Sequence, residues 1–269
     1  MNEARPEVTL AGLQAMKAAG EKIACLTAYD ASFAARLAEA GVDVVLVGDS
    51  LGMVVQGQDS TLPVSLADMI YHARAVARAA GPMLRVVDMP HASYASVEQA
   101  VANARRLVED GGAQMVKLEG GSEMLPVIRA LLAAGIPVCG HLGLLPQSVR
   151  RLGGYRVQGR EPEQAARIRA DAEVLAEAGI GLLVLECIPA PLAAAISRDL
   201  AVPTIGIGAG ADCDGQVLVL HDLLGITPGR RPRFVRDFLA GRDSVPAALT
   251  AYVRAVKAGD FPGPEEAYA

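Results

Sequence analysis

Eight short apolar runs recur along this chain of 269 residues, and stretches with helical patterning separate them. The runs span residues 23–29, 44–49, 84–88, 115–119, 138–141, 182–186, 204–207 and 217–221. Runs without polar alternation are typical of strands that are covered on both faces, as in parallel sheets. Eight strand–helix units in about 250 residues match a closed (β/α)8 barrel, so we expect one barrel domain over residues 1–269. The alternative is an open, doubly wound sheet in which the last two runs are irregular.

Glycines and capping residues indicate where the helices begin and end. A glycine stands shortly before six of the runs, where left-handed helix ends and short helix-to-strand loops are expected: Gly20, Gly41, Gly81, Gly112, Gly135 and Gly179. Ser65/Asp68 and Ser96/Gln99 have the spacing of capping pairs. We expect residues 8–20 to form a helix that closes one end of the barrel, and residues 245–258 to form a terminal helix.

The loops that follow the second and fifth runs are long. They span residues 50–64 and 143–162, whereas the loops that lead into the runs are short. In a parallel barrel the loops that leave the strands build the active-site face. The extra length therefore lies where ligands are expected to bind.

Four of the apolar runs end in an acidic residue. Asp49, Asp88 and Glu119, which we call the acidic trio, end three consecutive runs and would be neighbours on one rim of a barrel. Three oxygen ligands without a nearby histidine or cysteine cluster suit Mg²⁺ or a similar hard cation. The alternative for each carboxylate is that it caps the helix that follows it.

Three further polar residues stand at the ends of expected strands. Lys117 precedes Glu119 by two residues and should face the same side, either as a plain ion pair or as a cation that holds an anionic substrate. His141 is expected either to make a structural hydrogen bond or to donate to a substrate carboxylate or oxyanion. Glu186 is expected on the opposite side of the ring from the acidic trio, where apolar surroundings would raise its pKa and suit a general base. Its alternative is a salt bridge to an arginine of the long fifth loop.

Net charge, the length of the apolar runs and the spacing of the cysteines exclude several classes of protein. The formal net charge of −5 argues against non-specific binding to nucleic acid. No apolar run reaches the roughly 20 residues that a membrane span needs, and the N-terminus lacks the pattern of a secretory signal. We therefore expect a cytoplasmic protein with small-molecule substrates and neither a nucleic-acid nor a membrane partner. The four cysteines are widely spaced and are expected to be buried free thiols: Cys25, Cys139, Cys187 and Cys213.

Six strings between Cys25 and Gly225 resemble one known family. They are GDSLGMVVQGQDSTLPV, VKLEGG, GHLGLLPQS, GGYRVQGR, LLVLECIPA and TIGIGAGADCDGQVLVLHDLLG. Together they closely resemble the ketopantoate (3-methyl-2-oxobutanoate) hydroxymethyltransferase family. The resemblance implies a metal-dependent (β/α)8 barrel of the phosphoenolpyruvate mutase/isocitrate lyase type. It also implies transfer of a hydroxymethyl group from methylenetetrahydrofolate to 3-methyl-2-oxobutanoate, giving 2-dehydropantoate in pantothenate (coenzyme A) biosynthesis, by a homodecamer.

The resemblance also implies roles for individual residues. One Mg²⁺ per subunit falls on the acidic trio, and Glu186 falls on the general base. The oxo acid is expected to contact Asp49, Ser50, Asp88, Lys117 and His141, of which Ser50 is added by the resemblance alone. The chain departs from the family pattern at His91, at Leu145 and in the tail after residue 265.

Two other activities are compatible with the same residues. One is a metal-dependent lyase or aldolase that acts on another 2-oxo acid, and the other is a non-catalytic barrel that binds oxo acid or folate. Supplying methylenetetrahydrofolate or an aldehyde as acceptor distinguishes the transferase from the lyase or aldolase. A single-turnover assay distinguishes the transferase from the non-catalytic barrel. The presence of Glu186 argues against the non-catalytic alternative.

Overall fold

Eight parallel strands form a closed barrel in which each strand pairs with the next along the chain and β8 pairs with β1. The computed structural model describes residues 5–149, 154–229 and 231–269. The strands are β1 (Ile23–Thr27), β2 (Val44–Val47), β3 (Leu84–Asp88), β4 (Met115–Glu119), β5 (Val138–Gly143), β6 (Leu182–Glu186), β7 (Thr204–Ile207) and β8 (Gly215–Leu218). The expected (β/α)8 barrel is confirmed, and the open doubly wound sheet is wrong.

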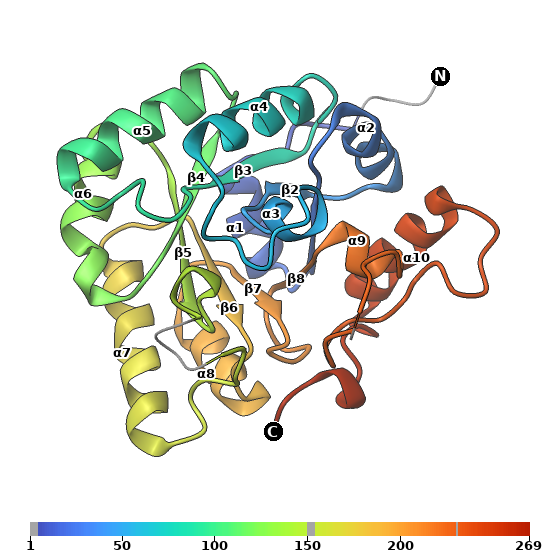
Figure 1. Cartoon of the computed structure of the whole chain (residues 1–269). Helices are drawn as coiled ribbons and strands as arrows, with labels where there is room; N and C mark the ends of the chain where they lie inside the picture. The colour runs from blue at the N-terminus through green and yellow to red at the C-terminus, as the bar shows by residue number, and fades with distance from the viewer. Residues whose placement is uncertain (1–4, 150–153, 230) are drawn as a thin grey trace.

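Helices surround the barrel, as Figure 1 shows. They are α1 (Leu10–Ala18), α2 (Ala31–Ala40), α3 (Leu51–Val54), α4 (Leu66–Ala77), α5 (Val97–Glu109), α6 (Leu125–Ala133), α7 (Pro162–Glu177), α8 (Ala190–Asp199), α9 (Leu220–Leu223) and α10 (Val245–Ala258). The described residues also form the short 3₁₀ helices η1 (Ser122–Met124), η2 (Pro146–Ser148) and η3 (Pro264–Glu266). The terminal helix expected over residues 245–258 coincides with α10.

The predicted helix ends agree with the backbone at nearly every position. All six of the glycines before strands have positive φ, between 54° and 99°. Ser65 and Asp68 form a complete capping box at the start of α4. The second capping pair is only half formed, because Ser96 accepts from the Gln99 N–H while the Gln99 side chain accepts from Ala95 instead.

The expected bounds of four strands were wrong. The fifth strand continues to Gly143 instead of ending at His141. The last strand is Gly215–Leu218 rather than 217–221, and α9 begins at Leu220. Gln216 is polar but buried, because its side-chain amide donates to the Gly210 carbonyl at 2.9 Å, and this burial is not evident from the sequence. The first two strands end earlier than expected, so Asp49 lies two residues beyond β2.

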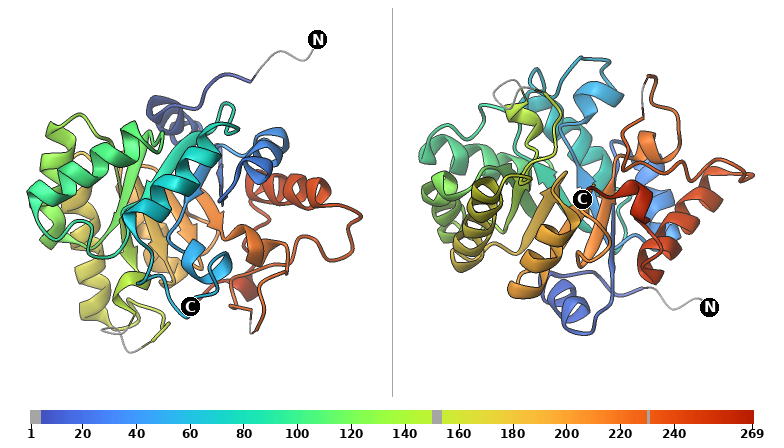
Figure 2. Two further views of the ribbon diagram at one scale, coloured as in Figure 1. Left: turned by 45° about the horizontal axis from the view of Figure 1, so that its top comes forward. Right: turned by 90° about the horizontal axis from the view of Figure 1, so that it is seen from below.

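One end of the barrel is closed by α1. Leu13 of this helix is fully buried in a cluster with inward-facing strand residues such as Ile23 and Met115. Both views in Figure 2 place α1 at the end of the barrel opposite α3. All four cysteines are buried and free, which confirms the expectation drawn from their spacing. Among the described residues, no helix has the length and apolar character that a membrane span needs.

Tyr252 of α10 contacts both β1 and β8 at the seam where the first and last strands of the barrel pair. This helix packs on α2 and β1. The fully buried Tyr252 hydroxyl lies 2.7 Å from the Cys25 carbonyl of β1 and 2.9 Å from the Gln216 carbonyl of β8. Its ring also stands edge-on to Phe238, with 5.4 Å between centroids.

We predict that Tyr252→Phe lowers the thermal unfolding midpoint. The variant keeps the ring but removes the hydroxyl that contacts two buried carbonyls. The free energy of unfolding should fall by about 2 kcal/mol, which lowers the unfolding midpoint by about 4–8 °C. Differential scanning calorimetry provides the measurement. Tyr71→Phe is the control, because Tyr71 is 72% exposed and should leave the midpoint unchanged. Equal midpoints for the two variants would contradict the role of this hydroxyl in the seam.

Candidate active site

A cavity of about 930 Å³ opens at the carboxyl ends of the strands. Residues from both long loops line it, at the face where the sequence places ligand binding. The lining also includes every residue that the sequence singled out for the site: Asp49, Ser50, Asp88, Lys117, Glu119, His141 and Glu186. The barrel therefore brings all of these expected site residues to one cavity.

Asp88 organises the side of the cavity formed by β2, β3 and β4. It is the last residue of β3, and its Oδ1 lies 2.8 Å from Lys117 Nζ. Its Oδ2 accepts from the backbone N–H of Asp49 at 3.0 Å, which holds the turn after β2. The alternative of a plain ion pair between Lys117 and Glu119 is wrong, because the ion-pair partner of Lys117 among the described residues is Asp88 on the neighbouring strand. Burial disfavours the charge on Lys117, but Asp88, Glu119 and Asp49 outweigh it and raise the pKa of Lys117.

The buried carboxylates outnumber the cation beside them. Asp49, Asp88, Glu119 and Lys117 are each no more than 6% exposed. Burial, followed by repulsion from Asp88, raises the pKa of Asp49 to about 7. Burial, followed by repulsion from Asp49, raises the pKa of Glu119 well above its ordinary value. The site thus holds more negative charge than one lysine compensates.

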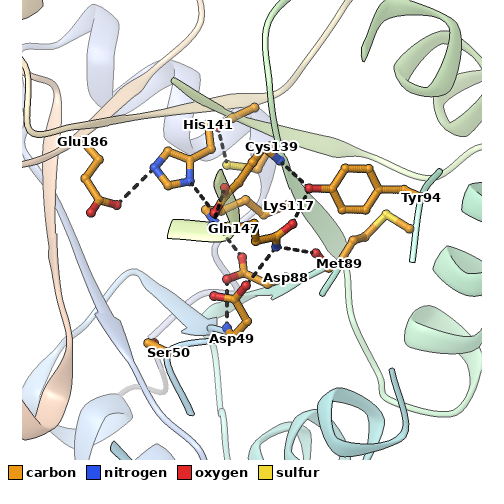
Figure 3. Close-up of polar contacts among 12 residues, drawn as sticks. Asp49, Ser50, Asp88, Met89, Tyr94, Lys117, Cys139, His141, Gln147 and Glu186 are labelled. Atoms are coloured by element: carbon orange, nitrogen blue, oxygen red, sulfur yellow. Dashed lines mark hydrogen bonds and ion pairs between the residues drawn. The ribbon is translucent and has the colours of Figure 1, made fainter. Parts of the chain in front are cut away.

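Gln147 connects two members of the acidic trio and was not predicted. Its side-chain amide donates to Asp49 Oδ2 at 2.9 Å and to the Met89 carbonyl at 3.0 Å, while its backbone N–H donates to Glu119 Oε2 at 3.1 Å. The Tyr94 hydroxyl donates to Gln147 Oε1 at 2.5 Å. Figure 3 shows Gln147 between Asp49, Met89 and Tyr94. A neutral side chain in a loop carries no charge or spacing signal, and only the resemblance of the string GHLGLLPQS drew attention to this segment.

His141 lies between two carboxylates on the other side of the cavity. Its Nε2 is 3.2 Å from Glu186 Oε2, and its Nδ1 is 3.7 Å from Glu119 Oε1. Neither contact has hydrogen-bond geometry, and neither ring nitrogen has a hydrogen-bond partner among the described residues. Burial, with Lys117 next, lowers the pKa of His141 well below its ordinary value, so the imidazole is neutral. A neutral ring with open nitrogens can donate to a ligand.

Glu186 is less isolated from the acidic trio than expected. It ends β6, yet His141 links it to Glu119 through the two contacts above. Burial raises the pKa of Glu186 to about 8. Its alternative partner, an arginine of the fifth loop, is not found within 4.0 Å in the described ranges, and Arg150 and Arg151 lie outside them.

Ser50 stands at the start of α3, where its hydroxyl lies 2.9 Å from the Tyr29 hydroxyl. Burial is the main cause of a raised pKa at Tyr29, so this phenol stays protonated and can donate. His91, one of the departures from the family pattern, is exposed on the surface, and Leu145 is partly buried.

The donor set fits a hard cation, although the carboxylates are not gathered around one point. In residues 5–149, 154–229 and 231–269, no three histidine, cysteine, aspartate or glutamate side chains are arranged as a metal-binding group. The fit lies in the chemistry: three buried carboxylates, two with strongly raised pKa values, face one lysine. Oxygen donors that stand apart suit Mg²⁺, which keeps several waters in its shell.

The fold and cavity define the class of protein as a closed parallel (β/α)8 barrel with a cavity at the carboxyl ends of its strands. The structure resembles 2,3-dimethylmalate lyase, a member of the phosphoenolpyruvate mutase/isocitrate lyase superfamily, with a TM-score of 0.57 at 19% identity, covering 81% of this chain and 83% of the other. It resembles phosphonopyruvate hydrolase, in complex with oxalate and Mg²⁺, with a TM-score of 0.62 at 15% identity, covering 93% and 98%. These similarities concern the fold alone.

The chain belongs to the ketopantoate hydroxymethyltransferase family, whose model matches residues 7–264. It is 58% identical to the 3-methyl-2-oxobutanoate hydroxymethyltransferase of Halorhodospira halophila, with 97% of this chain and 94% of the relative covered. It is also 58% identical to the protein of the same name from Nitrosococcus oceani, with 97% and 99% covered.

We predict that Glu186 makes the protein, kept in chelator, less stable as the pH rises. The folded pKa of about 8 exceeds the ordinary value of 4.5, so the native state binds more protons between these values and loses stability as the pH rises through that window. Urea unfolding at about pH 6 and at about pH 9 gives the free energy of unfolding at each pH. From the lower to the higher pH, this free energy should fall by at least about 1 kcal/mol less in Glu186→Gln than in the unsubstituted protein.

Glu39→Gln is the control for this experiment, because the Glu39 side chain is 57% exposed on α2. It should follow the unsubstituted protein at both pH values. If Glu186→Gln also follows the unsubstituted protein, Glu186 does not titrate in this window.

Proposed function

We propose that this protein transfers a hydroxymethyl group from methylenetetrahydrofolate to 3-methyl-2-oxobutanoate, giving 2-dehydropantoate in pantothenate biosynthesis. The proposal rests on the 58% identity, over 97% of this chain, to relatives that carry the transferase name. Those relatives favour this transferase over a lyase, an aldolase or a non-catalytic barrel. The cavity at the strand ends, which combines an acidic end with room for a larger ligand, supports a reaction of two small molecules.

Asp49, Asp88 and Glu119 would hold one Mg²⁺ per subunit. Their burial and excess negative charge support this assignment. When bound, Mg²⁺ supplies a Lewis acid that draws charge from the keto and carboxylate oxygens of the oxo acid. Gln147 would keep Asp49 and Glu119 oriented toward the ion through its amide and backbone N–H.

The oxo acid would be held by residues on both sides of the cavity. Lys117, fixed by its ion pair with Asp88, presents a positive charge to the substrate carboxylate. His141 can donate a hydrogen bond because its ring is neutral and its nitrogens lack partners in the described part of the chain. Ser50, beside Tyr29, supplies a hydroxyl on the same wall. Asp49 and Asp88 would contact the substrate where it meets the ion.

Glu186 would remove the proton from the substrate carbon next to the keto group. A base is most useful when its pKa lies near the working pH, and burial raises the pKa of Glu186 to about 8. The carboxylate takes the proton, and the electron pair of the broken C–H bond remains on the oxo acid as an enolate. The enolate carbon then bonds to the folate methylene carbon as one of the two C–N bonds of that carbon breaks. Water replaces the second nitrogen and supplies the hydroxyl of the product, while its other proton and the proton taken by Glu186 go to the two folate nitrogens, so that tetrahydrofolate leaves. Glu186 is therefore the catalytic residue of the first step.

We also infer that the protein works in the cytoplasm as a homo-oligomer. Four buried free thiols suit a reducing compartment. The family resemblance favours a decamer, and analytical ultracentrifugation would measure the number of subunits.

We predict that the protein exchanges a proton of the oxo acid with solvent when folate is absent, and that it forms product when methylenetetrahydrofolate is present. In D₂O with Mg²⁺ and the oxo acid alone, proton NMR should show loss of the signal from the carbon next to the keto group. Adding methylenetetrahydrofolate should give 2-dehydropantoate, detected by mass spectrometry. Glu186→Gln should slow the exchange by about 10²–10⁴-fold, because the amide cannot accept the proton.

Glu39→Gln again provides the matched control and should exchange at the original rate. Undiminished exchange in Glu186→Gln would move the base to another residue, of which His141 is the nearest. An absence of product with methylenetetrahydrofolate, while an aldehyde is accepted, would overturn the proposed transferase.

We predict that Gln147→Leu weakens Mg²⁺ binding. Loss of an outer partner that orients a metal ligand typically costs about 10–100-fold in affinity. Isothermal titration calorimetry with Mg²⁺, without substrates, provides the measurement. Gln14→Leu, on the exposed surface of α1, is the control and should bind as the unsubstituted protein does. Unchanged affinity in a folded Gln147→Leu protein would contradict the positioning role.

A further inference from the structure

The cavity has opposite charges on different parts of its wall. The acidic trio and Glu186 lie at the strand ends. The described residues of two segments, the loop between β5 and α7 and the stretch between α9 and α10, supply positive charge instead. Among these described residues, four arginines, which we call the arginine rim, line the cavity: Arg156, Arg160, Arg231 and Arg233.

Two arginines of the rim have structural partners, and the other two have no ion-pair partner among the described residues. Arg231 Nη2 lies 3.0 Å from Asp237 Oδ2, and Arg233 Nε donates to the Glu265 carbonyl at 2.8 Å. Arg156 and Arg160 are exposed, and no carboxylate of the described residues lies within 4.0 Å of either guanidinium. An uncompensated pair of arginines beside a cavity favours an anionic ligand.

Aromatic rings adjoin the rim. The Arg233 guanidinium lies over the Tyr268 ring, 5.7 Å from its centroid. Tyr155, which is the neighbour of Arg156 in the chain, and Phe234 also line the cavity. Rings of this kind can pack against a flat heteroaromatic group. Apolar packing and positive charge are therefore available to one ligand.

The size of the cavity leaves room for such a ligand beside the oxo acid. Its volume of about 930 Å³ lies near the upper end of the roughly 300–1,000 Å³ typical of sites for drug-sized molecules. A five-carbon oxo acid fills a small part of that space. The remainder suits a larger co-substrate.

We propose that the arginine rim binds the glutamyl carboxylates of the folate co-substrate. This inference rests on the proposed function, because it takes the folate to be the second substrate. The buried carboxylates repel the anionic glutamyl chain, whereas a guanidinium offers paired donors that match a carboxylate. The charge difference thus orients the folate with its pteridine toward the acidic end and its glutamyl chain at the arginine rim.

The test compares tetrahydrofolate carrying one and five glutamyl residues. Isothermal titration calorimetry on the full chain with Mg²⁺ should give a dissociation constant about tenfold lower for the longer chain, since each exposed arginine–carboxylate pair contributes a factor of about two to five. The double variant Arg156→Gln/Arg160→Gln should lose most of this advantage.

The matched control is Arg105→Gln/Arg129→Gln, which removes two exposed arginines from α5 and α6, outside the cavity. Both double variants change the formal net charge from −5 to −7, so a general charge effect would act on both. The control should keep the full advantage of the longer chain. Raising the salt from about 0.1 M to about 1 M shortens the screening length from about 10 Å to about 3 Å and should remove the advantage in the unsubstituted protein, whether or not the variants fold.

Equal affinities for the two folates in the unsubstituted protein would overturn the proposal. So would an advantage that survives in Arg156→Gln/Arg160→Gln, or one that salt does not change. Each of these results leaves the transferase intact if 2-dehydropantoate still forms from the one-glutamyl folate. Failure to form product with either folate would instead overturn the proposed function, and the subsite with it.

Discussion

The site depends on one cation, Lys117, held among carboxylates that have been taken out of water. Its ion pair with Asp88 is 2.8 Å long and almost fully buried. A buried charge without a partner is strongly unfavourable, and Lys117 can compensate only one of the carboxylates that surround it. Asp49 and Glu119 respond with raised pKa values. The remaining negative charge calls for either protons or a cation, and the cation is the solution that we propose.

The barrel holds this unfavourable arrangement in place from several directions. Strands β3 and β4 end in Asp88 and Glu119, so the backbone ladder fixes where two of the carboxylates start. Gln147 then ties the long fifth loop to the acidic side of the cavity, and Tyr94 holds the amide of Gln147. Because these contacts come from segments distant in sequence, the geometry of the site depends on closure of the whole ring. The helix α1 and the Tyr252 seam therefore support the site although they lie away from the cavity.

The fold and the charged residues of the site could be predicted because both follow local patterns. Unbroken apolar runs located seven strands well, and carboxylates at run ends indicated the rim. The eighth strand was misplaced because Gly215 and Gln216 are not apolar. Likewise, the spacing of Lys117 and Glu119 predicts a shared face but not which neighbouring strand supplies the ion-pair partner, which is Asp88. Gln147 and Tyr94 could not be found from local patterns at all, since a neutral loop residue gains its role only from tertiary contacts.

The most direct test of the central claim is a crystal of the protein soaked with Mn²⁺ and the oxo acid, with data collected for anomalous scattering. Mn²⁺ is a hard cation that prefers oxygen ligands as Mg²⁺ does. We expect one strong anomalous peak per subunit among Asp49, Asp88 and Glu119. A cavity without a peak there, with Mn²⁺ bound elsewhere or not at all, would show that protons rather than a cation compensate the buried carboxylates, and would contradict the account.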